Sequence, residues 1–182
     1  MSFAAGRGAC IAAFTLVLAA CAPALDWRDV RAVGSSLQMQ FPCRPQLQER
    51  TVRLAGASVR LALQACSAGG QTWGLGLADV GDPARVEAAL TELRAAAAAN
   101  LGTQAAALRP LAVPGATPHA GAGRMGLDGR GPDGAPLRME LAVFAHGTQV
   151  FQASVLGAAV PAEAAQAYFS SLRFALSSGP AR

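Results

Sequence analysis

Lysine is absent from this sequence: all fifteen of its basic residues are arginine, set against eleven acidic residues. Aromatic residues make up only 5% of the chain. Proteins that bind nucleic acid usually concentrate basic residues in a stripe with aromatic residues between them. This composition therefore argues against a nucleic-acid partner. Arginine without lysine, together with abundant alanine and glycine, is typical of the coding bias of a GC-rich genome.

Long hydrophobic runs are also missing. The longest, residues 10–20, contains eleven residues and is apolar except for Thr15, whereas a transmembrane helix takes roughly 20. A weakly charged start, a short apolar run and small residues before a break are typical of a cleaved secretory signal peptide. We therefore expect residues 1–20 to be a signal. The remaining 162 residues carry a net charge of +3 and have about the length of one domain.

The apolar run ends in the motif Leu18-Ala19-Ala20-Cys21, which resembles the lipobox of bacterial lipoproteins. The resemblance implies that Cys21 receives a diacylglyceryl group, becomes the new N-terminus and is acylated again. Because stable anchoring takes two lipid signals, such a residue would hold the protein on a membrane. The alternative is an ordinary secreted protein in which Cys21 has no role. Ala22, in place of the Asp that retains enterobacterial lipoproteins on the inner membrane, favours the outer membrane, facing the periplasm.

Two further cysteines remain in the mature chain, Cys43 and Cys66. An oxidising compartment favours a disulfide between them. Strand alternation, however, places Cys43 on the apolar face of its strand and Cys66 on the opposite face of its own, so a bend is needed to bring them together. Pro42 can supply that bend, and a bridge would then stabilise the fold by roughly 3 kcal/mol. Two separate buried thiols are the alternative.

Alternating apolar residues predict strands at residues 37–41, on both sides of a hairpin loop at Gly56-Ala57, and at residues 71–80. With that loop, Arg53 and Arg60 would lie directly opposite each other. Like charges so placed repel mildly. We expect the two arginines either to splay into solvent or to hold an anion between them, which makes them candidate anion contacts.

Asp82-Pro83 predicts a helix start, because a carboxylate caps the first turn and proline suits its first position. Apolar residues recur at helical spacing up to Gly102, a natural stop. A second helix is predicted from Pro161. Between the helices, the Gly- and Pro-rich residues 114–136 should contain a strand near residue 126, and residues 137–156 read as a hairpin.

The order strands, helix, strands, helix predicts an α+β fold: an antiparallel β-sheet with two main helices packed on it. We expect a lipidated tether at residues 21–36, one domain at residues 37–176 and a disordered tail at residues 177–182. The stretch "MQFPCRP", the helix at residues 83–101 and the closing "AYFSSLRF" give the domain a resemblance to the PsbP-like fold. That resemblance implies an α/β/α sandwich from a family that mostly binds or assists other components, and it transfers no active-site residue.

Catalytic and metal-binding patterns are missing. The two histidines, His119 and His146, have no paired spacing that suits zinc, and no GxSxG motif is present. We therefore expect no enzyme, metal or cofactor, but an accessory or protein-interaction module with an envelope protein as partner. The alternative is a module that holds a small apolar or anionic ligand between sheet and helix. That alternative would gain support if Arg53, Arg60 or Arg138 lined a pocket.

Overall fold

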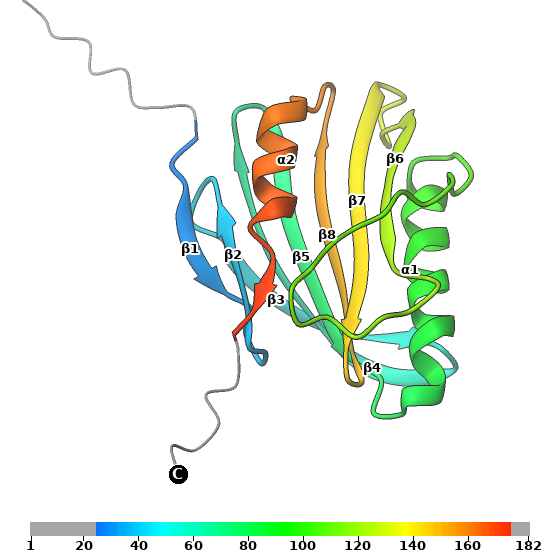
Figure 1. Cartoon of the computed structure of the whole chain (residues 1–182). Helices are drawn as coiled ribbons and strands as arrows, with labels where there is room; N and C mark the ends of the chain where they lie inside the picture. Colours follow the sequence, from blue (N-terminus) through cyan, green and yellow to red (C-terminus); the bar gives the residue numbers. More distant parts are fainter. Residues whose placement is uncertain (1–24, 176–182) are drawn as a thin grey trace, which may run out of the picture.

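A computed structural model describes residues 25–175 (Figure 1). The predicted signal peptide, Cys21 and the predicted tail lie outside the described residues. The elements in chain order are β1 (Arg28–Arg31), β2 (Leu37–Phe41), β3 (Gln46–Leu54), β4 (Ala57–Ala68), β5 (Gln71–Asp79), a 3-10 turn (Pro83–Arg85), α1 (Val86–Asn100), β6 (Gly123–Arg130), β7 (Pro136–His146), β8 (Gln149–Gly157), α2 (Ala162–Ser170) and β9 (Arg173–Phe174).

The main sheet has six strands in the order β3-β4-β5-β8-β7-β6, and all neighbours are antiparallel. The chain builds β3, β4 and β5 as successive hairpins and leaves the sheet through α1. It then returns to build β6, β7 and β8, so that β8 lies beside β5. A second, smaller sheet has the order β1-β2-β9. Both helices were predicted, but the division into two sheets was not.

Helical structure begins at Pro83, as predicted, but its first three residues form a 3-10 turn and α1 proper starts at Val86. The Asp82 side chain accepts a hydrogen bond from the backbone N–H of Ala84 at 2.9 Å, and Pro83 occupies the first turn. At the other end Gly102 has a φ of +65°, the left-handed conformation that glycine adopts without strain. Neither α1 nor any other described helix is long and apolar enough to span a membrane.

The six-stranded sheet is the middle layer of three. Along β7, Leu141 and Val143 belong to a core shared with α1, whereas Ala142 and Phe144 belong to a core shared with α2 and the small sheet. Because successive side chains of a strand point to opposite faces, the two cores lie on opposite sides of the sheet (Figure 1). The α+β prediction is confirmed. One outer layer is α1, and the other combines α2 with β1, β2 and β9.

The folded part of the chain starts before residue 37. Strand β1 lies within residues 21–36, the segment predicted to be a tether, and pairs with β2. Just ahead of it, the ring of Trp27 meets the ring of Trp73 edge-on, with 5.7 Å between centroids. These contacts bury apolar surface at the start of the described chain, which explains why this segment joins the fold.

A disulfide joins Cys43 to Cys66, with 6.0 Å between their Cα atoms, as predicted. The alternative of two separate thiols is wrong. A bend at residues 42–43 takes Cys43 out of strand β2, which removes the parity conflict. The bridge connects the segment between β2 and β3 to β4, and so ties the small sheet to the large one. The expected contribution is about 3 kcal/mol.

Tyr168, the single tyrosine of the chain, is fully buried on the inner face of α2. Its hydroxyl donates a hydrogen bond to the carbonyl oxygen of Gly74 at 2.8 Å. The rings of Phe41 and Trp73 meet it edge-on. Burial raises the pKa of Tyr168 well above its ordinary value of 10.0, because the phenolate would lose its hydration.

This raised pKa predicts a loss of stability in alkali. Above about pH 10 the tyrosine of the unfolded chain ionises while that of the folded chain stays neutral, so the free energy of unfolding falls as the pH rises. Tyr168→Phe should remove this dependence, at a cost of about 1 kcal/mol near neutral pH for the lost hydrogen bond. Urea unfolding of both proteins at about pH 8 and about pH 11 checks this. Equal alkaline losses in the two proteins would contradict it.

Candidate functional site

The two faces of strand β5 differ sharply in the size of their side chains. Trp73 and its neighbours at alternate positions are large and pack in the core shared with α2. The opposite face carries Gly74, Gly76 and Ala78. On that face Gly76 lies between Leu63 of β4 and Gln152 of β8. A row of small residues between longer ones forms a trough along β5.

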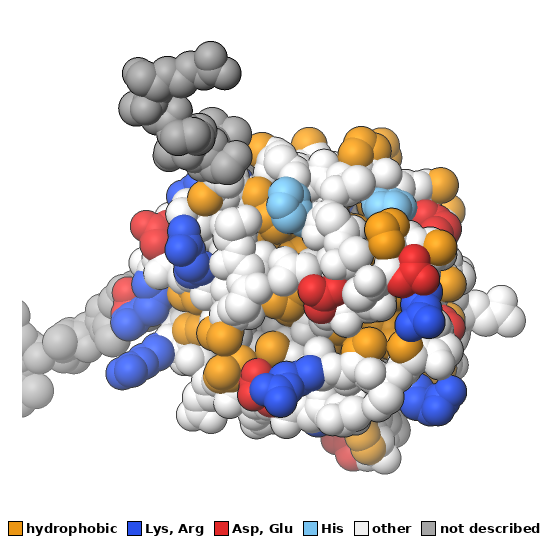
Figure 2. All heavy atoms as spheres, turned by 90° about the horizontal axis from the view of Figure 1, so that it is seen from below, with side chains coloured by type: hydrophobic (Ala, Val, Ile, Leu, Met, Phe, Trp, Pro, Cys, Tyr) orange, Lys and Arg blue, Asp and Glu red, His pale blue; other side chains and the backbone are white. Residues whose placement is uncertain are grey.

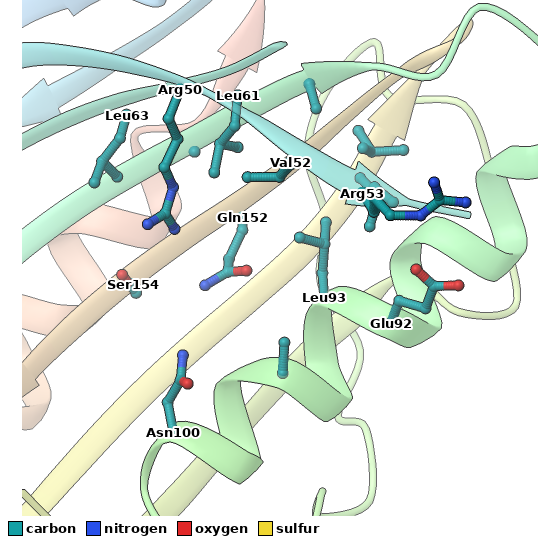
Figure 3. A pocket seen from close by; sticks show the side chains of 15 residues that line it. Arg50, Val52, Arg53, Leu61, Leu63, Glu92, Leu93, Asn100, Gln152 and Ser154 are labelled. Carbon is teal, nitrogen blue, oxygen red and sulfur yellow. The ribbon is translucent and has the colours of Figure 1, made fainter. Parts of the chain in front are cut away.

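Helix α1 leaves this trough partly uncovered, because it packs over β7 and β8 rather than over β3 and β4. The space between α1 and strands β3, β4, β5 and β8 is a cleft of about 320 Å³, which we name the α1 cleft (Figure 3). Its apolar lining includes Val52, Leu61, Leu63, Ala78, Val150 and Leu93. Ligand cavities commonly span roughly 300–1,000 Å³, so the α1 cleft is of suitable size for a small molecule.

Polar groups gather at one end of the α1 cleft. Arg50 reaches in from β3, Gln152 and Ser154 rise from β8, and Asn100 lies at the end of α1 (Figure 3). Arg50 points toward Gln152 and Ser154. Within residues 25–175 its guanidinium makes no hydrogen bond or ion pair. Arg50 is exposed, so this end of the cleft carries a positive charge that meets solvent and that no described side chain neutralises, beside an apolar floor.

The opposite end of the cleft is closed by a contact between α1 and the β3–β4 loop. Glu92 of α1 accepts a hydrogen bond from the backbone N–H of Ala55 at 2.8 Å. Nearby, Arg53 donates to the carbonyl oxygen of Gly56 at 3.3 Å. Glu92 is the only carboxylate among the residues that line the cleft. Its charge is far from Arg50 in Figure 3 and does not neutralise it.

The predicted pairing of Arg53 with Arg60 is wrong: the hairpin loop lies one residue earlier than expected, which shifts the cross-strand register by two residues. The hairpin loop is Ala55-Gly56, both with positive φ (50° and 75°), so Leu54 pairs with Ala57. A two-residue hairpin of this kind requires positive φ at both loop positions. Arg53 then faces Ser58, while Arg60 faces Thr51. Arg60 forms an ion pair with Glu49 at 3.6 Å.

Of the three arginines named in advance, Arg53 lines the α1 cleft, whereas Arg60 and Arg138 do not. Arg50 also lines the cleft, but it was not singled out from the sequence. Its sequence neighbours, Glu49 and Thr51, give no sign of its role. The alternate positions of β3 that include Arg50 also carry Gln46, Gln48, Val52 and Leu54, so this face is polar at one end and apolar at the other. An exposed arginine at the boundary between the two gives no local sign of a role.

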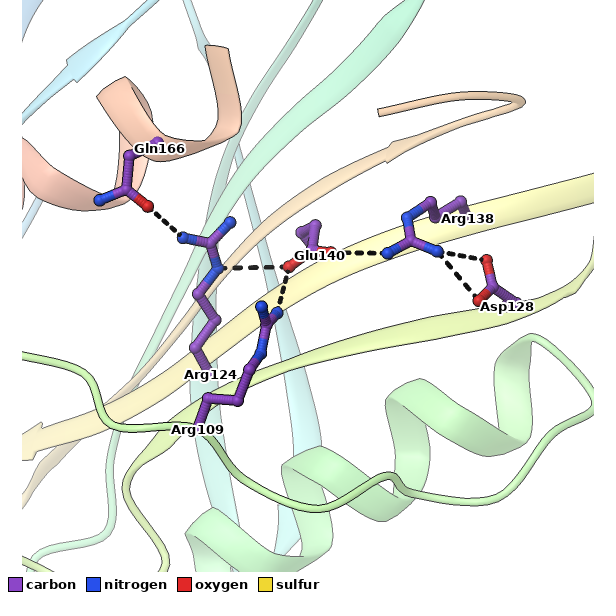
Figure 4. A network of polar contacts seen from close by, with 6 residues as sticks. All are labelled: Arg109, Arg124, Asp128, Arg138, Glu140 and Gln166. Carbon is purple, nitrogen blue, oxygen red and sulfur yellow. Dashed lines mark hydrogen bonds and ion pairs between the residues drawn. The ribbon is translucent and has the colours of Figure 1, made fainter. Parts of the chain in front are cut away.

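Arg138 belongs instead to a network around Glu140, on the other face of the sheet (Figure 4). The Glu140 side chain is only 8% exposed, and it accepts hydrogen bonds from Arg109 at 2.8 Å, Arg124 at 3.2 Å and Arg138 at 3.1 Å. Arg138 also binds Asp128 at 2.8 Å. The hydrogen bond and charge of Asp128, with a smaller contribution from Glu140, raise the pKa of Arg138.

A glycine makes room for this network. Gly126 lies directly opposite Glu140 in the β6–β7 register, and a Cβ atom at residue 126 would lie 3.0 Å from a carboxylate oxygen of Glu140. All three arginines are engaged by carboxylates. We therefore interpret the Glu140 network as structural. Sequence reasoning missed it, since nothing local marks Glu140 as buried.

The two histidines are also engaged by other residues. The Nδ1 atom of His119 lies 3.6 Å from the Oε2 atom of Glu87. His146 stacks on Phe174, with 4.3 Å between ring centroids, and its Nδ1 atom lies 2.8 Å from the carbonyl oxygen of Gly115. Among residues 25–175, no group of three or more His, Cys, Asp or Glu side chains is placed to hold a metal ion.

Comparison with protein-family models, with curated proteins and with solved structures gives no match to this chain.

The Glu140 network predicts unequal effects of two substitutions. Glu140→Gln should lower the free energy of unfolding by roughly 3 kcal/mol, because it leaves three arginines around a neutral, buried amide. Asp128→Asn is the matched control: this side chain is 73% exposed and also pairs with Arg138, so its loss should cost less than about 1 kcal/mol. Urea unfolding measures both. Similar small losses would contradict the structural role of Glu140.

Proposed function

We propose that this protein is a lipid-anchored envelope protein whose folded domain binds a small ligand in the α1 cleft. The observation that carries the proposal is the cleft itself: an apolar trough over Gly76 and Ala78, with the unpaired guanidinium of Arg50 at one end. A concave, largely apolar site with a few convergent polar groups is the usual form of a small-molecule site. The motif ending in Cys21 supports the anchor, on the outer membrane and facing the periplasm.

A role as an accessory or protein-interaction module has less support. A large contiguous apolar patch on the surface often marks a site that binds a protein partner. Among the described residues, only Val33 and Leu47 are large apolar side chains that are exposed. On the face in Figure 2, charged side chains of both signs are interspersed with small groups of apolar ones. The geometry therefore favours the ligand-binding alternative that the sequence left open.

We also propose that the domain binds its ligand without transforming it. The cleft lining contains a single carboxylate and no histidine or cysteine. General acid–base or nucleophilic catalysis needs a nucleophile and a base within hydrogen-bonding reach of each other. Ser154 is the one hydroxyl in the lining, and no histidine lies beside it there. The PsbP-like character of the fold is a further proposal, supported by the element order and by a sheet placed between helices.

The anchor hypothesis predicts a specific modification. Mass spectrometry of the protein from its native membrane should find an N-terminal peptide that starts at Cys21 and carries acyl chains, because the lipobox resemblance places cleavage and acylation there. Cys21→Ser should abolish incorporation of labelled palmitate. Cys10→Ser is the control: it changes a cysteine that is removed with the signal, and labelling should persist. Unchanged labelling of Cys21→Ser would refute the anchor.

The cleft hypothesis predicts that filling the trough abolishes binding. A Cβ atom at Gly76 would meet its neighbours at ordinary distances of 3.6 Å or more, so Gly76→Leu should fold and project into the cleft. We expect 8-anilinonaphthalene-1-sulfonate, an apolar anion, to bind residues 21–182 carrying Cys21→Ser. This segment retains every described residue. Adding Gly76→Leu should weaken binding by about tenfold or more.

Thr72→Leu is the matched control, because it adds the same side chain to the same face of β5, outside the α1 cleft. It should leave probe binding unchanged. Thermal unfolding establishes that each variant is folded. Equal binding to the Gly76→Leu and parent proteins would overturn the assignment of the site.

A further inference from the structure

The charge and the volume of the α1 cleft together define a class of ligand. We infer that the cleft binds a single-chain amphiphile with a carboxylate head, a molecule of the fatty-acid type, whose carboxylate is held by Arg50. This inference rests on the proposed function, and it specifies which small molecule the site accepts.

The positive charge at one end of the cleft belongs to Arg50. The arginines of the β3–β4 hairpin differ in their partners: Arg53 binds a backbone carbonyl and Arg60 binds Glu49. Arg50 has no such partner within residues 25–175 and points into the cleft (Figure 3). A guanidinium presents two parallel N–H donors that match the two oxygens of a carboxylate. A carboxylate at this point would meet the charge that the protein leaves uncompensated.

Neutral hydrogen-bond donors lie around Arg50. The amide of Gln152, the hydroxyl of Ser154 and the amide of Asn100 lie at the same end of the cleft. Each can donate a hydrogen bond to a carboxylate oxygen. The single carboxylate of the lining, Glu92, lies at the other end and already accepts a hydrogen bond from Ala55. The donors at Arg50 therefore mark the place of an amphiphile's head, and its tail would extend toward Leu93.

Apolar side chains in the cleft lining suit the hydrocarbon tail of an amphiphile. Leu61 and Leu63 flank the trough on β4, Val150 borders it on β8, and Leu93 projects from α1. Gly76 keeps the floor low, and a glycine inside a strand often marks a place where a ligand approaches closely. Every methylene that enters such a trough leaves water, which favours binding. An inorganic anion would gain nothing from this surface.

The volume of the α1 cleft limits the size of the ligand. At about 320 Å³, the cleft lies near the lower end of the range of ligand cavities. This space matches one acyl chain better than the two chains of a phospholipid. A neutral alcohol of the same chain length would fill the trough but leave Arg50 unpaired. The charge of Arg50, the apolar lining and the volume of the cleft together select a single-chain carboxylate.

The test compares two probes of equal chain length, laurate and dodecanol, each below the concentration at which it aggregates. Isothermal titration calorimetry uses residues 21–182 carrying Cys21→Ser. We expect laurate to bind more tightly than dodecanol. Arg50→Ala should weaken laurate binding by about tenfold or more, the size expected for losing a charge-assisted hydrogen bond, and leave dodecanol binding unchanged. Arg60→Ala, on the opposite face of the same hairpin, should behave like the parent.

The outcomes separate this inference from the function it rests on. If both probes bind equally and Arg50→Ala has no effect, the carboxylate assignment is overturned while the cleft remains a ligand site. If neither probe binds, but the anilinonaphthalene probe does so in a manner sensitive to Gly76→Leu, the acyl-chain class is overturned. If no probe binds, both proposals fail. Arg50→Lys keeps the charge without the paired donors and should give an intermediate loss of laurate affinity.

Discussion

The unequal faces of strand β5 are the constraint on which the rest of the structure depends. Trp73 is buried on one side of the sheet, where the rings of Trp27 and Tyr168 both meet its ring edge-on. The Tyr168 hydroxyl then binds the Gly74 carbonyl of the same strand, which fixes α2 on this face. On the other side Gly76 contributes no side chain at all. A dense core on one face and a hollow on the other follow from six consecutive residues of alternating size.

That hollow stays open because its ends and edges are held by other contacts. Glu92 binds the β3–β4 loop and keeps α1 at a fixed distance from that hairpin. The disulfide between Cys43 and Cys66 ties β4 to the small sheet on the far side. An uncovered apolar floor costs free energy in proportion to its area, roughly 25 cal/mol per Å². A ligand that covers this floor would recover that free energy.

The features that escaped prediction all depend on residues distant in the sequence. Arg50 gains its role from the pairing of β5 with β8, which decides that Gln152 and Ser154 lie beneath it. Glu140 is buried because Arg124 of β6 and Arg109 of the preceding segment converge on it. Strand β1 has only four residues and no apolar alternation that could reveal it. The error at Arg53 and Arg60 arose because Ala55 adopts a positive φ, which its identity does not suggest.

The sequence by itself determined the elements whose signals are local: the capped 3-10 turn at Asp82-Pro83 that leads into α1, the end of α1 before Gly102, and the strand alternations of β2, β5, β7 and β8. It also made the disulfide possible, by placing Pro42 before Cys43. Only the tertiary structure decided that α1 covers β7 and β8 and leaves part of β5 uncovered. Local backbone preferences act between neighbouring residues, whereas a cleft depends on which surfaces the fold leaves unfilled. The candidate site therefore became visible only once the layers were assembled.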